Sequence, residues 1–304
     1  MANLRVDLAG VQLTNPVLTA SGCFASGAEM DRFYDVHTLG AVIVKSITLE
    51  PRQGLPTPRM AETPSGMLNA IGLQNPGIDR WIAVDLPWLQ EHRVPVIVSL
   101  AGTSVDEYRA LARKVKGLEG IVAIEVNISC PNVEDRNIVF ACRAEPAAAV
   151  IDAVRREAAV PVFAKLTADV TDITEIARAV VAAGASGLSL INTLLGMAID
   201  VGTGRPKLAN VVGGLSGPAI RPIAVRAVWQ VHQVLPDVPI IGTGGISSAE
   251  DAIEFVLAGT SAVAVGTANF VNPLAASDLV RDLDAWCDDH GVKAVSDLRG
   301  GLRT

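Results

Sequence analysis

The 304-residue chain contains few aromatic residues, few lysines and no long hydrophobic run. Phe, Trp and Tyr make up 4% of it, and it has six lysines and four histidines. No stretch approaches the roughly 18 uninterrupted apolar residues that cross a bilayer. The N-terminal MANLRVDLAG has neither the apolar centre of a signal peptide nor the Arg- and Ser-rich composition of a transit peptide. We therefore expect a cytoplasmic protein that does not enter a membrane.

Clustered positive charge and paired cysteines are also lacking. A net charge of −7 and a pI near 5.2 argue against nucleic-acid binding, which usually requires a basic patch. The four cysteines form no CxxC pair, so the spacing of a zinc or iron–sulfur site is missing and we expect no metal. In a reducing compartment Cys23, Cys130, Cys142 and Cys287 should be free thiols.

What the sequence does contain is an alternation of apolar runs with helix-period segments. The runs lie at 16–20, 41–45, 96–100, 122–128, 162–166, 187–191, 239–242 and 262–266. The helical segments lie at 104–117, 145–158, 172–183, 219–235, 247–258 and near 275–289. Continuous Val/Ile runs between helices indicate parallel strands covered by helices. Eight such strands predict an α/β fold of the (β/α)8 TIM-barrel type, as one domain over 1–304 with an N-terminal hairpin. A doubly wound sheet is the alternative.

Three connections, 46–76, 129–144 and 192–217, are longer than the usual two to six residues. All follow the carboxyl ends of predicted strands, where barrel enzymes build their active sites. The Pro- and Gly-rich segment 51–66 predicts an ordered excursion such as a hairpin. We therefore expect inserted loops over the C-terminal face of the barrel.

Two lysines, Lys45 and Lys165, end apolar strands in the segments AVIVK and PVFAK. Each could simply bury its stem and keep its ammonium in water. Together they could instead form a cation pair that faces an anionic ligand. A desolvated strand-end lysine could also form a Schiff base.

The last two predicted strands end in the glycine-rich turns IGTGGISS (241–248) and AVGTANF (264–270). Barrel enzymes commonly bind phosphate with the loops after strands 7 and 8. Gly244 and Gly245 would let backbone N–H groups approach phosphate oxygens, and Ser247 could cap the following helix. These turns favour a phosphorylated ligand, which could be FMN or a sugar phosphate.

The segment EVNISCPN (125–132) places Cys130 where a strand ends and a long loop begins. A thiol there, beside a cation such as Lys45, can act as a nucleophile or general base. None of the four histidines falls in a strand-end motif, which argues against a Cys–His hydrolase.

Four amide side chains, Asn69, Asn127, Asn132 and Asn192, are expected near the same barrel mouth. Each amide offers a donor and an acceptor, which suits a planar ligand with alternating C=O and N–H groups. A single loop Asn is usually only a turn former, but four at strand ends favour a binding role.

Over its whole length the chain resembles the class 1 dihydroorotate dehydrogenases, most specifically in NISCPN and NAIGLQNPG. The resemblance implies oxidation of dihydroorotate to orotate in pyrimidine (UMP) biosynthesis. Cys130 would remove the C5 proton, while N5 of FMN takes hydride from C6. The loop after the cysteine, VEDRNIVFACRAEP, departs from the Gly-rich family pattern.

The motifs also assign site residues by resemblance. Substrate contacts would be Lys45, Asn69, Ala70, Ile71, Gly72, Leu73, Asn127, Asn132, Asn192 and Thr193. FMN contacts would be Ala20, Ser21, Lys45, Ser46, Ser99, Asn127, Lys165, Ile191, Gly217, Thr243, Gly244, Gly245, Val265, Gly266 and Thr267. Ser99 departs from the family, which usually has an Asn facing the flavin there.

Within this family, the motif wording is most similar to the NAD-linked class 1B type. That similarity implies a homodimer core joined by a separate electron-transfer subunit carrying FAD and a 2Fe-2S cluster, as a heterotetramer. Alternatives are a fumarate-linked class 1A enzyme and a dihydropyrimidine dehydrogenase-like flavin barrel. An isomerase or synthase with Lys165 as Schiff base, and a non-catalytic scaffold, are further alternatives.

Overall fold

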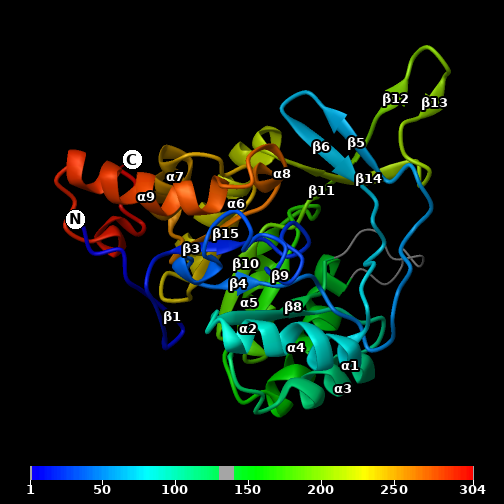
Figure 1. The fold of residues 1–304 in the computed structure, drawn as a ribbon, viewed down its shortest axis with the longest axis horizontal. Coiled ribbons are helices and arrows are strands. Elements are labelled where there is room, and N and C mark those ends of the chain that lie inside the picture. The colour runs from blue at the N-terminus through cyan, green and yellow to red at the C-terminus, as the bar shows by residue number, and fades with distance from the viewer. Residues whose placement is uncertain (1, 130–139, 304) are drawn as a thin grey trace.

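A closed barrel of eight parallel strands forms the centre of the computed structural model, which describes residues 2–129 and 140–303 (Figure 1). Its strands are β3 (Val17–Thr19), β4 (Val42–Ile43), β7 (Val96–Leu100), β8 (Ile121–Asn127), β9 (Val162–Leu166), β10 (Gly187–Leu190), β15 (Ile240–Thr243) and β16 (Ala262–Val265). The hydrogen-bonded order is β3-β16-β15-β10-β9-β8-β7-β4. A parallel bridge between Leu18 and Ala41 joins the two ends of this order. The predicted TIM barrel is confirmed.

Helices cover the barrel, and the six predicted helices are present. They are α3 (Val105–Val115), α4 (Ala144–Glu157), α5 (Ile173–Ala182), α6 (Arg221–Val234), α7 (Ala249–Ala258) and α9 (Ala275–Asp289). Shorter elements are η1 (Val36–Thr38), η4 (Phe140–Cys142), η5 (Pro218–Ile220), α8 (Ala268–Val271) and η6 (Val295–Leu298). Between β3 and β4 the described chain forms only turns and η1, so this barrel unit lacks an α-helix.

One helical region was not predicted from the sequence. Residues 78–91 form α1 (Ile78–Arg80), the π-helical turn η2 (Trp81–Asp85) and α2 (Leu86–Glu91), which cover the step from β4 to β7. A π turn contains more residues than an α turn, so it breaks the 3.6-residue spacing that a helix search detects. Pro87 within the segment further weakens the pattern.

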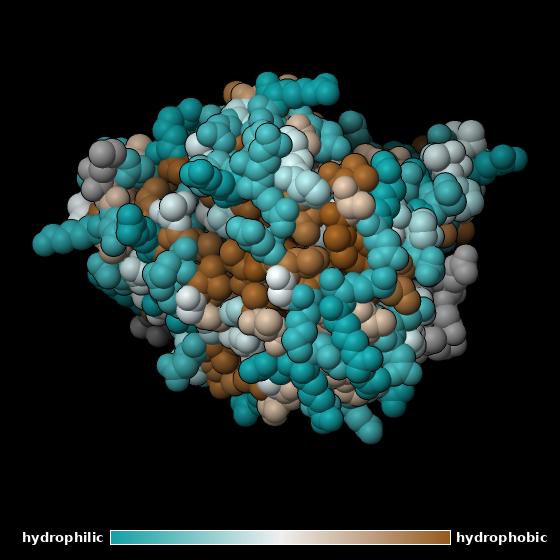
Figure 2. Space-filling view, turned by 60° about the horizontal axis from the view of Figure 1, so that its bottom comes forward, coloured by the Kyte–Doolittle hydropathy of each residue, from teal (hydrophilic) through white to brown (hydrophobic). Residues whose placement is uncertain are grey.

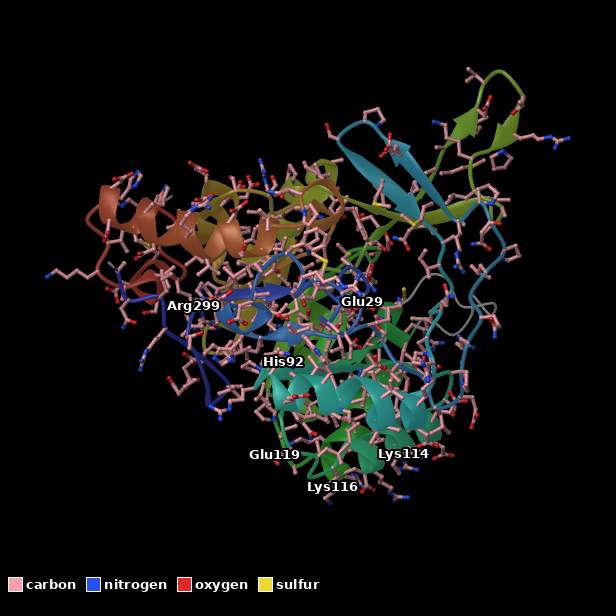
Figure 3. The ribbon with its side chains drawn as sticks, viewed as in Figure 1. Glu29, His92, Lys114, Lys116, Glu119 and Arg299 are labelled. Atoms are coloured by element: carbon pink, nitrogen blue, oxygen red, sulfur yellow. The ribbon has the colours of Figure 1, made fainter. Side chains whose placement is uncertain are left out.

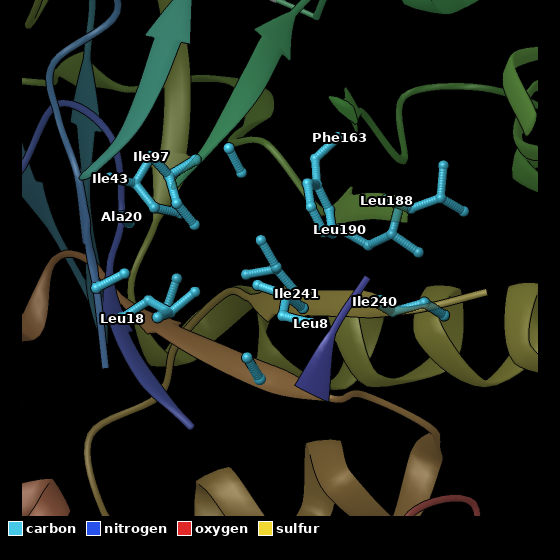
Figure 4. Packing of buried hydrophobic residues seen from close by; sticks show 14 of the residues in the cluster. Leu8, Leu18, Ala20, Ile43, Ile97, Phe163, Leu188, Leu190, Ile240 and Ile241 are labelled. Atoms are coloured by element: carbon cyan, nitrogen blue, oxygen red, sulfur yellow. The ribbon is translucent and has the colours of Figure 1, made fainter. Parts of the chain in front are cut away.

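The N-terminal hairpin predicted from the sequence is confirmed. β1 (Val6–Leu8) pairs with β2 (Val11–Leu13) in antiparallel register. Its Leu8 is buried and lies beside Ile241 of β15 in Figure 4. The hairpin therefore contributes apolar side chains to the core.

Two of the long connections meet in one four-stranded antiparallel sheet at the C-terminal face of the barrel. β5 (Met60–Thr63) and β6 (Gly66–Asn69) come from the first connection, and β11 (Leu194–Met197) and β14 (Val212–Ser216) from the third. Their order is β11-β14-β6-β5. β12 (Ile199–Asp200) and β13 (Arg205–Pro206) form a small projecting hairpin (Figure 1). The expected hairpin in 51–66 is real but lies further along, at 60–69.

Aliphatic side chains and the phenyl ring of Phe163 make up most of the core around the barrel strands (Figure 4). Phe163 of β9 is fully buried and lies against Gly187 of β10. An ideal Cβ on Gly187 would lie only 2.2 Å from the Phe163 ring and 2.8 Å from the Pro239 carbonyl oxygen. Gly187 is therefore required because the ring occupies the space of a side chain.

The surface is mainly hydrophilic, but hydrophobic residues gather in the centre of the face shown in Figure 2. None of the helices in the described part of the chain combines the length and hydropathy needed to cross a bilayer.

We predict that Gly187→Ala lowers the free energy of unfolding by about 1–3 kcal/mol, as overpacking of a well-filled core does. Urea unfolding followed by circular dichroism measures this loss. Adding Phe163→Leu to the Gly187→Ala variant should recover part of the stability, because a smaller side chain makes room for the Cβ. Equal stability of Gly187→Ala and the parent protein would contradict the steric argument.

Candidate active site

A cavity of about 1500 Å³ opens at the carboxyl ends of the barrel strands. Its floor is formed by residues that end strands or directly follow them, including Ser21, Lys45, Asn127 and Gly266. The inserted sheet contributes a side wall through Met60, Met67 and Asn69. The cavity therefore opens at the face of the barrel where the sequence predicts the site.

Most of the site residues predicted from the sequence line this cavity. They are Ala20, Ser21, Lys45, Ser46, Asn69, Ile71, Gly72, Leu73, Asn127, Lys165, Ile191, Asn192, Thr193, Gly217, Thr243, Gly244, Gly245, Gly266 and Thr267. Cys130 and Asn132 lie outside the described residues. Parts of the chain separated by more than 200 residues thus meet around one space.

Three of the predicted contacts, Ala70, Ser99 and Val265, do not line the cavity. All three are buried, with exposed fractions of 0%, 0% and 1%. Ala70 packs in a small cluster with Leu68 and Leu208 of the insertions. Ser99 points into the barrel, where it hydrogen-bonds to other buried groups rather than facing a ligand. These three residues therefore lie behind the residues that line the cavity.

The two glycine-rich turns form one end of the cavity. Gly244 and Gly245 have φ angles of +138° and +77°, a region that favours glycine. An ideal Cβ on Gly245 would lie 2.7 Å from the carbonyl oxygen of Gly217, so the backbone comes close to its neighbour. The hydroxyl of Thr243 is buried, with no hydrogen-bond partner among the described residues. This orphaned polar atom fits a cavity end that holds a polar ligand group.

The helix after the first glycine turn begins differently from the prediction. Ser248, not Ser247, is the N-cap of α7, because its side chain accepts a hydrogen bond from the backbone N–H of Asp251. Asp251 in turn accepts hydrogen bonds from the backbone N–H of Ser248 and from Ser247, which completes a capping box. Arg221 of α6 forms an ion pair with Asp251 and so joins the two helices that flank the turn.

A buried ion pair lies beneath the cavity. Lys165 Nζ is 3.5 Å from Glu125 Oε1 and donates a hydrogen bond of 3.1 Å to Ser21 Oγ. Glu125 is fully buried, and Lys165 is 4% exposed. Because an isolated buried charge is very costly, each member of this pair requires the other. Lys165 lines the cavity from this position, so the simple snorkelling interpretation is wrong for it.

Amide side chains meet at a second side of the cavity. The amide nitrogen of Asn192 donates to Ser129 Oγ at 2.9 Å and to Asn127 Oδ1 at 3.4 Å. Asn69 donates to the carbonyl oxygen of Gly214, across the inserted sheet. Three of the four predicted amides thus line one cavity, as expected for a ligand with hydrogen-bonding edges.

Several cavity residues were not identified from the sequence. They include Gly22, Cys23, Arg52, Arg59 and Ser216. An ideal Cβ on Gly22 would lie 3.4 Å from Lys45 Nζ, and Ser216 Oγ accepts a hydrogen bond of 2.7 Å from Thr267. The only signal for Gly22 and Cys23 is that they follow the end of a predicted strand.

Charged side chains at and just beyond the C-terminal end of α3 lie away from this cavity. Lys114, Lys116 and Glu119 lie at the lower, helical edge in Figure 3, whereas the cavity-lining Glu29 lies near the middle of the molecule. Lys114 pairs with Asp79 on the exposed surface. These peripheral pairs should contribute little to stability or to the site.

The structure is that of a TIM-barrel protein with a cavity at its C-terminal rim and glycine turns at one end of that cavity. The profile of the dihydroorotate dehydrogenase family matches residues 3–286, and the chain belongs to this family. The chain is 52% identical over 300 residues to the "Dihydroorotate dehydrogenase B (NAD(+)), catalytic subunit" of Geobacillus kaustophilus, covering 99% of this chain and 96% of that protein. It is 54% identical over 295 residues to the protein of the same name from Desulforudis audaxviator, covering 97% and 96%.

A solved structure shows the same fold. The dihydroorotate dehydrogenase of Eimeria tenella, crystallised with ferulenol, superposes with a TM-score of 0.82 at 22% identity. The match covers 99% of this chain and 89% of that one. This similarity independently supports the barrel topology.

We predict that Cys23 reacts slowly with iodoacetamide near neutral pH. Burial raises the pKa of the Cys23 thiol, and this effect outweighs the nearby Lys165 and Lys45, which lower it. The reactive thiolate should therefore form only above the ordinary cysteine pKa of about 8.5. Alkylation rates between pH 7 and pH 10.5, measured by peptide mass spectrometry, give the midpoint. A midpoint below the ordinary value would make Cys23 a rival candidate for the base.

Proposed function

We propose that the chain oxidises dihydroorotate to orotate with bound FMN, as the catalytic subunit of an NAD-linked enzyme. The observation that carries this proposal is one cavity with glycine turns at one end and amide side chains at its side. Membership of the dihydroorotate dehydrogenase family supports it, as does the name shared by relatives about half identical over the whole chain. In this proposal residues 1–304 act as one FMN-binding domain in the cytoplasm.

The residues present fit FMN. The turns at Gly244–Gly245 and Gly266–Thr267 would receive the phosphate, and the orphaned Thr243 hydroxyl offers a further polar contact. Lys165 would face the ring system with its position held by Ser21 and Glu125. When bound, FMN supplies the acceptor for hydride from C6 of the substrate. The remaining proposed contacts are Ala20, Ser21, Lys45, Ser46, Asn127, Ile191, Gly217 and Thr267.

Dihydroorotate would bind at the amide side of the cavity. Asn69, Asn127 and Asn192 would match its C=O and N–H edge, and Lys45 would face its carboxylate. The backbone of Ile71–Leu73 and the Thr193 side chain would complete the pocket. Asn132 is proposed as a further contact from its motif alone.

Cys130 is proposed as the base that removes the C5 proton. This role rests on its motif and on its sequence neighbour Ser129, which is buried and hydrogen-bonded to Asn192. Cys23 lines the same cavity, but its raised pKa keeps it protonated at neutral pH. A thiol that stays protonated is poorly suited to act as a general base.

The relatives are named catalytic subunits, which supports a second subunit that completes the enzyme. We propose that this subunit carries FAD and a 2Fe-2S cluster, and that it joins a homodimer of the present chain in a heterotetramer. NAD would then be the final electron acceptor.

Anaerobic titration of the purified protein with dihydroorotate tests this function. We expect a yellow protein with about one FMN per chain, whose absorbance near 450 nm is bleached stoichiometrically by dihydroorotate. The reduced protein is then offered NAD and fumarate separately and should be reoxidised slowly by either. Adding the partner subunit should speed reoxidation by NAD. Dihydrouracil serves as the control substrate and should bleach the flavin poorly, since it lacks the carboxylate.

Four outcomes would contradict the proposal. A colourless protein would exclude the flavin and favour the Schiff-base alternative. Bleaching by dihydrouracil in preference to dihydroorotate would favour the dihydropyrimidine dehydrogenase-like alternative. Rapid reoxidation by fumarate would favour the class 1A type, and rapid NAD reduction by the isolated chain would remove the need for a partner.

We predict that Cys130→Ser retains FMN but slows flavin reduction by at least about 10²-fold near neutral pH, as loss of a general base does. A serine hydroxyl is a far weaker base than a thiolate, so the rate should rise with pH beyond the range of the parent protein. Stopped-flow absorbance under anaerobic conditions measures this rate. Unchanged reduction kinetics would remove Cys130 from the role of base.

A further inference from the structure

Glu125 is a buried carboxylate that no step of the proposed reaction uses. It lies on β8 at the barrel centre, is fully buried and does not line the cavity. Besides the ion pair with Lys165, it accepts hydrogen bonds from Ser99 Oγ at 3.0 Å and Ser189 Oγ at 2.8 Å. Burying an ion pair at the barrel centre is costly, and a pair of apolar residues in place of Glu125 and Lys165 would fill the space at lower cost. This arrangement therefore calls for a role beyond packing.

A chain of hydrogen bonds leads from Glu125 to the amide side of the cavity. Ser99 Oγ lies 2.9 Å from Ser46 Oγ, and Ser46 Oγ accepts a hydrogen bond of 2.9 Å from the amide nitrogen of Asn127. The intermediate Ser99 and Ser46 are 0% and 2% exposed, so water does not compete for these bonds.

The carboxylate fixes the direction of every bond in this chain. An ionised carboxylate can only accept, so the single hydroxyl proton of Ser99 points to Glu125. Ser99 must then accept from Ser46, whose own proton is thereby used. With its proton used, Ser46 Oγ can only accept a hydrogen bond from Asn127. Of the two ends of the Asn127 amide, only the NH2 end can donate one. A flipped Asn127 would place its oxygen against the Ser46 oxygen with no proton between them.

The orientation of Asn127 agrees with that of the next amide, Asn192, whose nitrogen also donates to Ser129 Oγ at 2.9 Å and to the Ser129 carbonyl oxygen at 3.2 Å. With the Asn127 nitrogen on Ser46, Asn127 Oδ1 faces the amide nitrogen of Asn192 at 3.4 Å. The oxygen of Asn192 meanwhile accepts from the backbone N–H of Thr193 at 2.8 Å, which agrees with the same direction. The chain from Glu125 and the contacts of Ser129 thus favour the same arrangement of donors and acceptors on these two cavity-lining amides.

We propose that Glu125 is a positioning residue that fixes the amide orientation of Asn127 through Ser99 and Ser46, and at the same time holds Lys165 toward the cofactor side. One carboxylate would then align both halves of the site. Its relevance to the pyrimidine ligand rests on the proposed function, whereas the orientation of the amide does not. The serine at position 99, where the family usually has an asparagine, has a role in this proposal. Its hydroxyl accepts from Ser46 and donates to Glu125.

Ser99→Ala tests this proposal without disturbing the ion pair. It removes the acceptor of the Ser46 proton, so Ser46 can donate back to Asn127 and the amide can rotate. Ser189→Ala is the matched control, since it removes an equally buried hydroxyl from the other oxygen of the same carboxylate and leaves the chain intact. Glu125→Gln is the second variant, because an amide can donate to Ser99 and reverse the chain. Thermal unfolding of each variant shows that it is folded.

The first measurement needs no ligand. Selective ¹⁵N-asparagine labelling resolves the Asn127 side-chain amide, and its proton exchange with water reports the bond to Ser46. We expect exchange about tenfold faster in Ser99→Ala, the size of one lost hydrogen bond, and unchanged in Ser189→Ala. Equal exchange in Ser99→Ala and the parent protein would overturn the proposal.

The second measurement uses the FMN-loaded protein and orotate, whose binding perturbs the flavin spectrum. Orotate should bind about tenfold more weakly to Ser99→Ala and Glu125→Gln, as expected for one misdirected hydrogen bond, and within about twofold of the parent in Ser189→Ala. Equal weakening by Ser189→Ala would reduce Glu125 to a structural role. If the parent protein bound no orotate, the proposed function would fail, while the exchange measurement would still decide the inference.

Discussion

The closure of eight parallel strands into a barrel is the constraint on which the site depends. Because all the strands run in one direction, residues that end separate strands meet at one rim. Ser21, Lys45, Asn127 and Gly266 are brought together in this way, although they are distant in sequence. The bridge between Leu18 and Ala41 completes the circle, and without it the first and second strands would lie at opposite edges of an open sheet.

Strand positions and the glycine turns were predictable because their signals are local. Continuous Val/Ile runs mark buried parallel strands, and Gly244–Gly245 stands directly after one of them. The helical region 78–91 was missed because its π turn shifts the hydrophobic period, and the N-cap of α7 was placed one residue early, at Ser247 instead of Ser248. Neighbouring serines are equally good caps in sequence, and only the backbone angles decide between them.

The side-chain directions at the site were less predictable than its location. Side chains two residues apart on a strand share a face, so position along the strand, and not alternation, separates a ligand contact from a buried group. Asn127 reaches the cavity, while Glu125 and Ser99 point into the barrel interior. The ion pair of Glu125 with Lys165 joins adjacent strands of the closed barrel, and the periodicity of the sequence does not predict this pairing. The sequence signal for the buried pair was a charged residue within each of two apolar strands.

The inserted sheet has a consequence for how the cavity can exchange its contents. β6 and β14 come from loops more than 100 residues apart, yet they share a ladder in which Gly214 is paired with Asn69. The two insertions therefore form one hydrogen-bonded wall on this side of the cavity, and neither can move independently of the other. Departure of a small molecule past this wall would therefore require both insertions to shift together.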